Sequence, residues 1–282
     1  MTYLVTGAGG QLGRAVLAEA QRRGLSAIGR SHTELPVEDA DVVHRQLAEI
    51  RPKAVLHCAA WTDVDGCEGD PERAELINGR GAARVAEACR EIRARLVYVS
   101  TDFVFDGQGT RPYREDDPVA PLSVYGQSKL AGERAVLEYP GFAVARTSWL
   151  FGPGGRNFPK AILARAKSGE PLRVVNDQTG SPTLTLDLAA ALLDLAQSDA
   201  PGGVYHAAND GSCTWHEFAQ QILARAGLGD VTVDTMSSAA LGRPAARPAY
   251  SVLDCSKLAA VRGGKGLPHY LDGLDRYLAT ES

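Results

Sequence analysis

The stretch "VTGAGGQLG", Val5 to Gly13, decides the fold, because three glycines stand three residues apart between an apolar run and an amphipathic segment. Gly7, Gly10 and Gly13 suit a turn in which the backbone approaches a ligand closely. The free N–H groups at the start of the following helix, together with the helix dipole, favour an anionic group such as a pyrophosphate. We therefore expect a dinucleotide-binding turn after the first strand, rather than a turn that merely tolerates glycine.

The segments after this turn alternate in the manner of repeated strand–helix–strand units. We predict strands at 3–7, 26–30, 54–59, 96–101 and 142–149, and helices at 11–23, 41–50, 71–93 and 123–139. Gly79 and Gly81 predict a kink or a close helix contact within the third helix. The pattern predicts the α/β class with a Rossmann-type doubly wound parallel sheet.

The composition changes after Trp149, where Gly, Pro, Asn and Thr become frequent. Further helices are predicted at 158–167, 186–197, 215–226 and about 270–279, and a sixth strand at 203–209. We expect residues 1–149, with about 183–226, to form the NAD(P)-binding Rossmann domain. Residues 150–182 with 227–282 are expected to form a small α/β C-terminal subdomain that binds substrate.

Composition excludes several classes of function. The 282 residues are 44% hydrophobic and 23% charged with a net charge of -4, so the basic excess typical of nucleic-acid binding is missing. No apolar run approaches the roughly 18 to 20 residues of a membrane span, and the first residues enter a strand-like run directly. We expect a cytoplasmic protein without a nucleic-acid or membrane partner. The five cysteines are odd in number and scattered, which predicts reduced thiols and no metal site.

The end of the second strand bears on the choice of cofactor. It reads "IGRSH", without the acidic residue that commonly binds the adenosine ribose. Arg30 with Ser31 would receive a 2′-phosphate there, which favours NADPH while leaving NADH acceptable; an exposed surface arginine is the alternative. Asp39, further along, is expected beside the adenine.

A possible reaction centre lies in two later stretches. In "VYGQSKLAGE", Tyr125 and Lys129 are four residues apart and share a helix face. In "LVYVSTDFVFDG", an apolar strand ends in Ser100, Thr101 and Asp102. These groups suit carbonyl reduction by a nicotinamide.

Tyr125 would donate the proton, and the Lys129 ammonium would lower the pKa of its phenol from about 10. Thr101 would bind the substrate oxygen. Asp102 either positions the substrate or caps the following loop.

The stretches "TGAGGQLG", "STDFVFDG" and "YGQSK", in this order, resemble the extended short-chain dehydrogenase/reductase family. Within it, "HCAAWTDVDGCE", "RTSWLFGPGGRNF" and "VVNDQTGSPT" resemble the dTDP-4-dehydrorhamnose reductases over nearly the whole length. The resemblance implies reduction of the 4-keto group of dTDP-4-dehydro-6-deoxy-L-mannose by NADPH or NADH, the last step of dTDP-L-rhamnose synthesis for cell-surface polysaccharides. A dTDP-sugar is the implied partner.

The resemblance also implies site residues. Cofactor contacts fall on Gly7, Gly10, Gln11, Leu12, Asp39, Cys58, Ala59, Ala60, Tyr125 and Lys129. Substrate contacts fall on Thr62, Val64, Thr101, Asp102, Val104, Tyr125 and Trp149, although a core tryptophan is the alternative for the last. Asn157 and Arg247 are further candidates for the nucleotide diphosphate. Some members form a magnesium-mediated dimer through an acidic residue where this chain has Ala15, so we expect no metal and a monomer or weak homodimer.

Two other functions compete with this interpretation. The first is another nucleotide-sugar enzyme of the extended family, a reductase, epimerase or dehydratase. Dehydratases carry Glu after the catalytic Asp, whereas Asp102 is followed by Phe103. The second is a non-catalytic NADP-binding regulatory subunit, as in the methionine adenosyltransferase beta subunit. The complete set of Thr101, Tyr125 and Lys129 favours catalysis.

Overall fold

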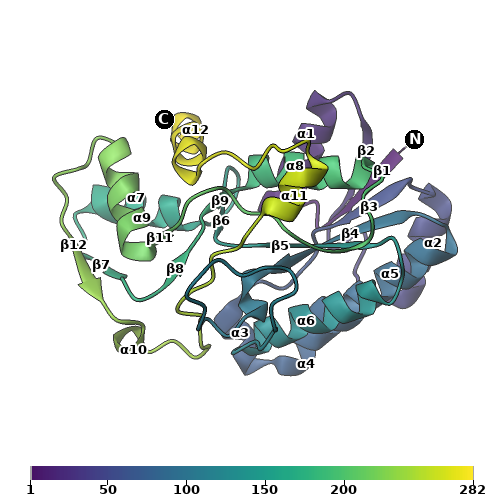
Figure 1. Cartoon of the computed structure of the whole chain (residues 1–282), viewed down its shortest axis with the longest axis horizontal. Coiled ribbons are helices and arrows are strands. Elements are labelled where there is room, and N and C mark those ends of the chain that lie inside the picture. The colour runs from purple at the N-terminus through teal and green to yellow at the C-terminus, as the bar shows by residue number, and fades with distance from the viewer. Residues whose placement is uncertain (1, 282) are drawn as a thin grey trace.

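A computed structural model describes residues 2–281 and contains a six-stranded parallel sheet in the order β10-β5-β4-β3-β1-β2 (Figure 1). Its strands are β1 (Thr2–Thr6), β2 (Ser26–Arg30), β3 (Ala54–His57), β4 (Arg95–Thr101), β5 (Ala143–Thr147) and β10 (Gly203–His206). Strand order reverses between the adjacent strands β1 and β3, as in doubly wound folds. The predicted fold class is confirmed.

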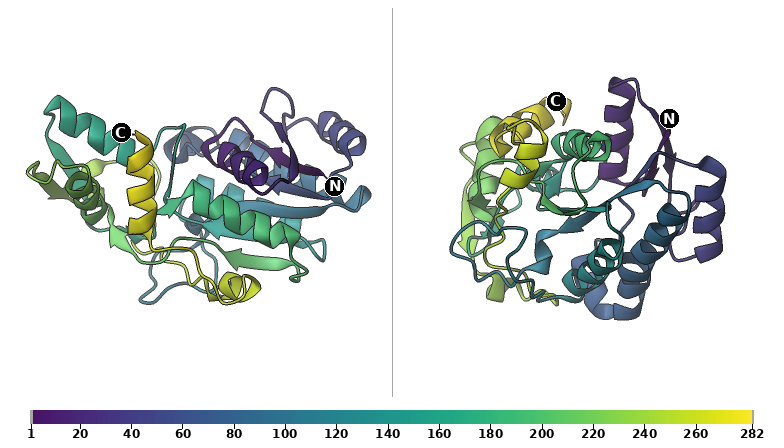
Figure 2. Two further views of the ribbon diagram at one scale, coloured as in Figure 1. Left: turned by 90° about the horizontal axis from the view of Figure 1, so that it is seen from above. Right: turned by 45° about the vertical axis from the view of Figure 1, so that its right-hand side comes forward.

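Helices cover both faces of this sheet, and alternate strand residues feed the two cores. The Val5, Leu56 and Val97 row packs under α1 (Gln11–Arg22) and α8 (Thr185–Gln197). The neighbouring row, which includes Leu4 and Val55, packs against α2 (Ala40–Ile50), α5 (Gly81–Glu91) and α6 (Val124–Leu137). Figures 1 and 2 show the sheet between these two helical layers.

The predicted third helix is interrupted, as its glycines suggested. It divides into α4 (Pro71–Ala74), the π-helical turn η1 (Glu75–Arg80) and α5. A Cβ on Gly81 would lie 2.8 Å from the Val37 side chain, so glycine permits a close contact there. The short elements that were not predicted include α3 (Val64–Gly69) and the 3-10 turn η2 (Asp102–Val104), because neither is long enough for an apolar period.

A second core lies beyond the carboxyl ends of the strands. It contains side chains of α7 (Phe158–Ser168), α9 (Trp215–Arg225) and α12 (Tyr270–Glu281). Short strand pairs surround it: β7 (Leu172–Val175) with β12 (Val233–Met236), β8 (Thr179–Gly180) with β11 (Cys213–Thr214), and β6 (Leu150–Phe151) with β9 (Thr183–Leu184). The short helices α10 (Ser238–Leu241) and α11 (Ser256–Val261) follow β12.

The packing of α9 differs from the sequence-based division of the chain. That division places 183–226 with the nucleotide-binding domain, but Phe218 and Ile222 of α9 are buried beside Phe151 in the second core. An amphipathic helix shows which of its faces is apolar but not which core buries that face. We therefore propose that α9 belongs with the substrate-binding part.

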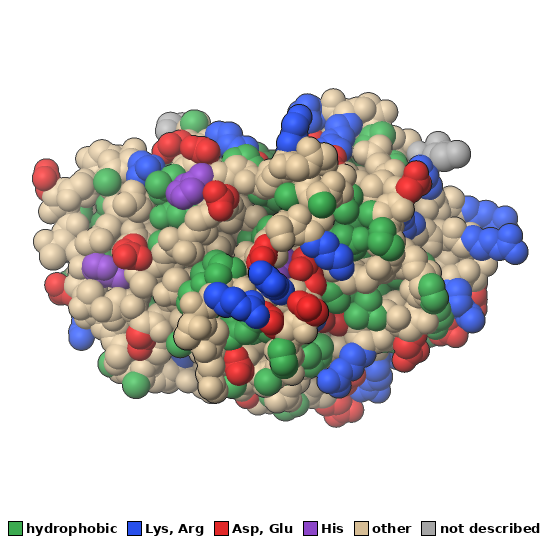
Figure 3. All heavy atoms as spheres, viewed as in Figure 1, with side chains coloured by type: hydrophobic (Ala, Val, Ile, Leu, Met, Phe, Trp, Pro, Cys, Tyr) green, Lys and Arg blue, Asp and Glu red, His purple; other side chains and the backbone are tan. Residues whose placement is uncertain are grey.

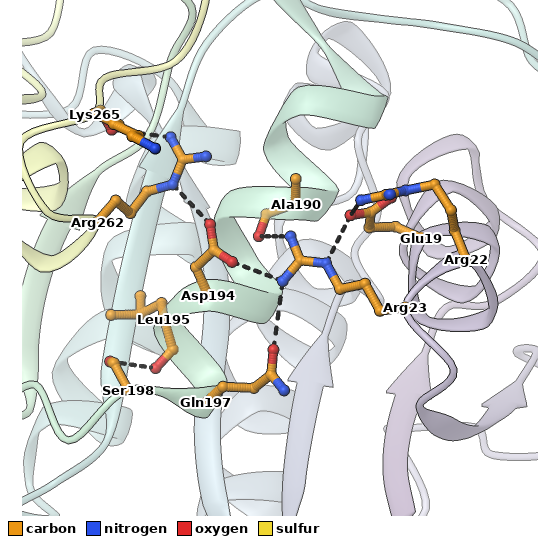
Figure 4. Close-up of polar contacts among 10 residues, drawn as sticks. All are labelled: Glu19, Arg22, Arg23, Ala190, Asp194, Leu195, Gln197, Ser198, Arg262 and Lys265. Carbon is orange, nitrogen blue, oxygen red and sulfur yellow. Dashed lines mark hydrogen bonds and ion pairs between the residues drawn. The ribbon is translucent and has the colours of Figure 1, made fainter.

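An ion-pair network joins α1, α8 and the segment after α11 (Figure 4). Arg23 lies between two carboxylates, 2.7 Å from Glu19 and 2.6 Å from Asp194, and Arg262 is 2.8 Å from the other side of Asp194. These side chains are partly shielded from solvent. The network ties the C-terminal end of α1 to α8, its neighbour in the helical layer.

The face shown in Figure 3 carries acidic and basic side chains interspersed, without a broad area of one sign. Within residues 2–281, no helix is both long and apolar enough to cross a bilayer. The same part of the chain holds no group of three or more His, Cys, Asp or Glu side chains placed to bind a metal ion. Ala15, a residue of α1, is buried in the core that this helix forms with the sheet and α8.

Candidate active site

Helix α6 carries Tyr125 and Lys129 on one face at the carboxyl end of β4. It begins after Ser123, whose hydroxyl accepts the Gly126 N–H at 3.2 Å. A Cβ on Gly132 would lie 2.5 Å from the Tyr98 hydroxyl, so glycine lets the helix approach the strand. Tyr125 and Lys129 are 9% and 2% exposed. The local sequence thus places a phenol and an ammonium group together inside the protein.

Lys129 has two partners for its charge. Its Nζ donates to the Val99 carbonyl at 2.7 Å and lies 4.1 Å from the centroid of the Tyr98 ring. The Tyr98 hydroxyl donates to the Asn78 carbonyl at 3.2 Å, which holds the ring. Burial lowers the pKa of Lys129 to about 7, although the Glu133 carboxylate opposes the shift. An anionic or hydroxyl-rich ligand would favour the charged form.

Thr101 connects the phenol to a buried carboxyl group. Burial raises the pKa of Tyr125, and the hydrogen bond with Thr101 opposes that effect. The Thr101 hydroxyl donates to Asp102 Oδ1 at 3.0 Å and accepts the Phe103 N–H at 3.2 Å. Thr101 therefore provides the cap of η2, a role for which Asp102 was the candidate.

Asp102 is 1% exposed. Burial raises its pKa to about 6, while hydrogen bonds from the Ser251 and Thr101 hydroxyls oppose the rise. Ser251 lies in the C-terminal part of the chain, so two distant segments meet at this carboxyl group.

The glycine turn borders a cavity of about 320 Å³. The cavity is lined by Gly7, Gly9, Gly10, His32, Leu35, Val37, Cys58, Ala59, Ala60, Trp61, Arg73 and Ile77. Gly7 has a φ of 64°, and a Cβ there would lie 2.7 Å from the Ala59 backbone. The cavity meets the N-terminus of α1, where N–H groups and the helix dipole face an anion. The glycine turn and the helix N-terminus of this lining thus suit a dinucleotide, and Gly7 cannot carry a side chain without meeting the Ala59 backbone.

Five of the predicted cofactor residues line this cavity, namely Gly7, Gly10, Cys58, Ala59 and Ala60. Gln11 and Leu12 form the first turn of α1, and Gln11 Nε2 donates to the Arg156 carbonyl at 3.3 Å. Tyr125 and Lys129 lie at the β4 end described above.

The other six predicted cofactor residues do not line the cavity: Gln11, Leu12, Tyr125 and Lys129, whose places are given above, and Arg30 and Asp39. Asp39 caps α2 by accepting the Val42 N–H at 3.0 Å, and Arg30 Nε donates to Gln46 at 3.0 Å. His32 and Arg73 are the basic side chains that line the cavity instead. Sequence reasoning missed both, because the path of the chain after β2 and the position of α4 depend on long-range packing.

The predicted substrate residues are divided in the structure. Val64 packs in the same cluster as Tyr125, and Thr62 is exposed nearby at the start of the α3 region. Val104 is fully buried in a different cluster with Phe105 and Tyr113, so its side chain is not available to a ligand.

Trp149 packs against the second core as a partly buried side chain. Its ring stacks on Trp215 with centroids 3.6 Å apart, and its φ is 47°. It remains partly exposed. Asn157 caps α7, and Arg247 pairs with Asp65 at 2.8 Å, so neither side chain is free in this conformation.

Comparison with known proteins is consistent with this geometry. The family model described as the RmlD substrate binding domain matches residues 1–282. A dTDP-4-dehydrorhamnose reductase of Streptomyces griseus is 45% identical, covering 95% of this chain and 90% of that protein. The Bacillus subtilis spore coat polysaccharide biosynthesis protein SpsK is 41% identical, covering 99% and 97%.

A solved structure agrees over the full length. The crystal structure of a dTDP-4-dehydrorhamnose reductase from Bacillus anthracis in complex with NADP has a TM-score of 0.95 at 37% identity, covering 99% of each chain. The match therefore includes both the sheet and the second core. On this sequence and structural similarity, the chain belongs to the family of the dTDP-4-dehydrorhamnose reductases.

Proposed function

We propose that the protein reduces the 4-keto group of dTDP-4-dehydro-6-deoxy-L-mannose to give dTDP-L-rhamnose, using NADPH. Family membership and the NADP held by the Bacillus anthracis relative support this substrate and cofactor. The observation that carries the proposal is the meeting of Tyr125, Lys129 and Thr101 at the end of β4, within the same sheet edge as the glycine turn. A cytoplasmic location and a monomer or weak homodimer stay predictions.

The roles of the three side chains follow from their chemistry. Bound NADPH would supply the hydride to the sugar carbonyl carbon. Burial keeps the Tyr125 phenol protonated at neutral pH, as a proton donor must be. Lys129 would stabilise the phenolate left after transfer, and its hydrogen bond to Val99 fixes the ammonium group. The Thr101 hydroxyl would turn from Asp102 toward the substrate oxygen, and Asp102 would hold it when the site is empty.

Replacing Tyr125 tests the proposal. In an assay that supplies dTDP-glucose with the upstream dehydratase and epimerase, Tyr125→Phe should lower kcat by about 10² to 10⁴-fold, because the proton donor is lost. The Kd for NADPH, measured by fluorescence titration, should change by less than about 2-fold, since the ring is retained.

Tyr139→Phe is the matched control, since Tyr139 packs against Phe142 away from the site; its kcat should equal that of the wild type. An unchanged kcat in Tyr125→Phe would remove the proton-donor role. Failure of the wild-type protein to oxidise NADPH with this sugar would overturn the proposed substrate.

A further inference from the structure

We infer that Arg73 binds the pyrophosphate of the dinucleotide together with the glycine turn. The inference rests on the proposed use of a nicotinamide dinucleotide. Arg73 lies in α4, yet it lines the same cavity as Gly7 and Gly10. A cation from outside the glycine turn would thus complement the N–H groups of α1.

The Arg73 side chain stacks on the ring of Trp61. Its Cζ lies 4.6 Å from the centroid of the Trp61 ring, a residue that also lines the cavity. Asn78 fixes Trp61 at both backbone groups, accepting its N–H at 2.8 Å and donating to its carbonyl at 3.0 Å. Asp70 caps α4 by accepting the Arg73 N–H at 3.0 Å. Arg73 is exposed to solvent, and its guanidinium lies over an indole whose backbone is fixed.

The charge of Arg73 has no carboxylate partner within residues 2–281, since none lies within 4.0 Å of it to form an ion pair. No Asp or Glu lines the cavity, and His32, the other basic lining residue, pairs with Glu38 at 2.6 Å. A cavity with a helix N-terminus, a guanidinium and no acid is complementary to an anion. Arginine suits phosphate oxygens because it donates in a planar fork.

The dinucleotide offers two sources of phosphate. The pyrophosphate is common to NADPH and NADH, whereas the 2′-phosphate occurs only in NADPH. His32 follows β2, the strand whose end faces the adenosine ribose in this fold, so it is better placed than α4 for the 2′-phosphate. Loss of Arg73 should therefore weaken both cofactors equally.

The test compares binding of the two cofactors to Arg73→Met, which keeps an apolar stem over Trp61 and removes the charge. The Kd values for NADPH and NADH, measured by calorimetry without sugar, should both rise by about 10-fold. The rise should shrink at high salt, because screening weakens the wild-type contact. Arg73→Lys should recover part of the affinity.

Arg80→Met is the control, since Arg80 is exposed on η1 and does not line the cavity; its Kd values should match the wild type. A loss confined to NADPH would assign Arg73 to the 2′-phosphate, and unchanged Kd values for both cofactors would remove it from the site. Either result overturns the inference. Failure of sugar reduction would leave these binding values intact, so the two proposals fail separately.

Discussion

At the scale of single residues, Lys129 is needed for the proposed reaction but destabilises the folded protein. It is 2% exposed, and burial lowers its pKa to about 7. An unfolded chain keeps this proton up to about pH 10.5. Between about pH 7 and about pH 10.5 the unfolded state binds more protons than the native state, so the free energy of unfolding rises with pH through this window. Below about pH 7, the buried charge of Lys129 destabilises the native state in full. Natural sites accept such destabilisation where a charge is needed for chemistry.

Lys129→Met should therefore abolish sugar reduction and raise the free energy of unfolding. The gain over the wild type should be largest at about pH 6 and should shrink at about pH 9.5, where the native wild-type lysine has lost its proton. Urea unfolding at the two pH values measures both differences. Lys167→Met, at an exposed position of α7, should show no pH-dependent gain. An equal gain at both pH values would refute the buried-charge explanation.

At the scale of elements, the site depends on how closely α6 approaches β4. The period of 123–139 predicted the helix, and its bounds of 124–137 agree within two residues. The spacing of Tyr125 and Lys129 predicted their shared face. The Tyr98 hydroxyl beneath Gly132 was not predictable, because a glycine within a helix does not indicate what it contacts.

Gly132→Ala tests this contact. Helix propensity favours alanine by about 1 kcal/mol, but overpacking against the Tyr98 hydroxyl and the Asn78 carbonyl opposes it by about 1 to 3 kcal/mol. We expect a net loss in the free energy of unfolding, measured in urea, together with a lower kcat because Lys129 shifts. Gly69→Ala, in α3 with open space around its Cβ, should be neutral or stabilising. A stabilised Gly132→Ala would show that the helix moves away without penalty.

At the scale of the whole molecule, Asp65 ties the C-terminal segment to the nucleotide-binding part. Arg247 donates to both carboxylate oxygens, at 3.0 and 2.8 Å, and the Ala245 N–H donates at 3.2 Å. Burial acts to raise the pKa of Asp65, but these hydrogen bonds outweigh that effect and lower the pKa to about 2. The Asp65 carboxylate therefore stabilises the native state at pH values above the unfolded pKa of about 4. This stabilisation is lost as the pH falls through about 2.

Asp65→Asn should loosen this segment, because the bidentate ion pair is lost. Cleavage by chymotrypsin after Leu241 or Tyr250, which lie on either side of the tied residues, should accelerate at neutral pH by about 5-fold or more, as expected when local opening becomes easier by about 1 kcal/mol. Mass spectrometry of the fragments over time measures the rate. Asp234→Asn, at an exposed position of β12, serves as the control. Equal cleavage rates would mean that the pairing adds nothing to the attachment.

The sequence by itself determined the parallel sheet, the glycine turn and the Tyr125 and Lys129 pair. Each depends on neighbours within a few positions along one strand, turn or helix. Only the tertiary structure decided that α9 packs in the second core, that Arg30 donates to Gln46 of α2, and that Arg73 borders the cavity. These outcomes depend on which distant surfaces meet, because a side chain's partner is set by the packing of whole elements rather than by its local pattern.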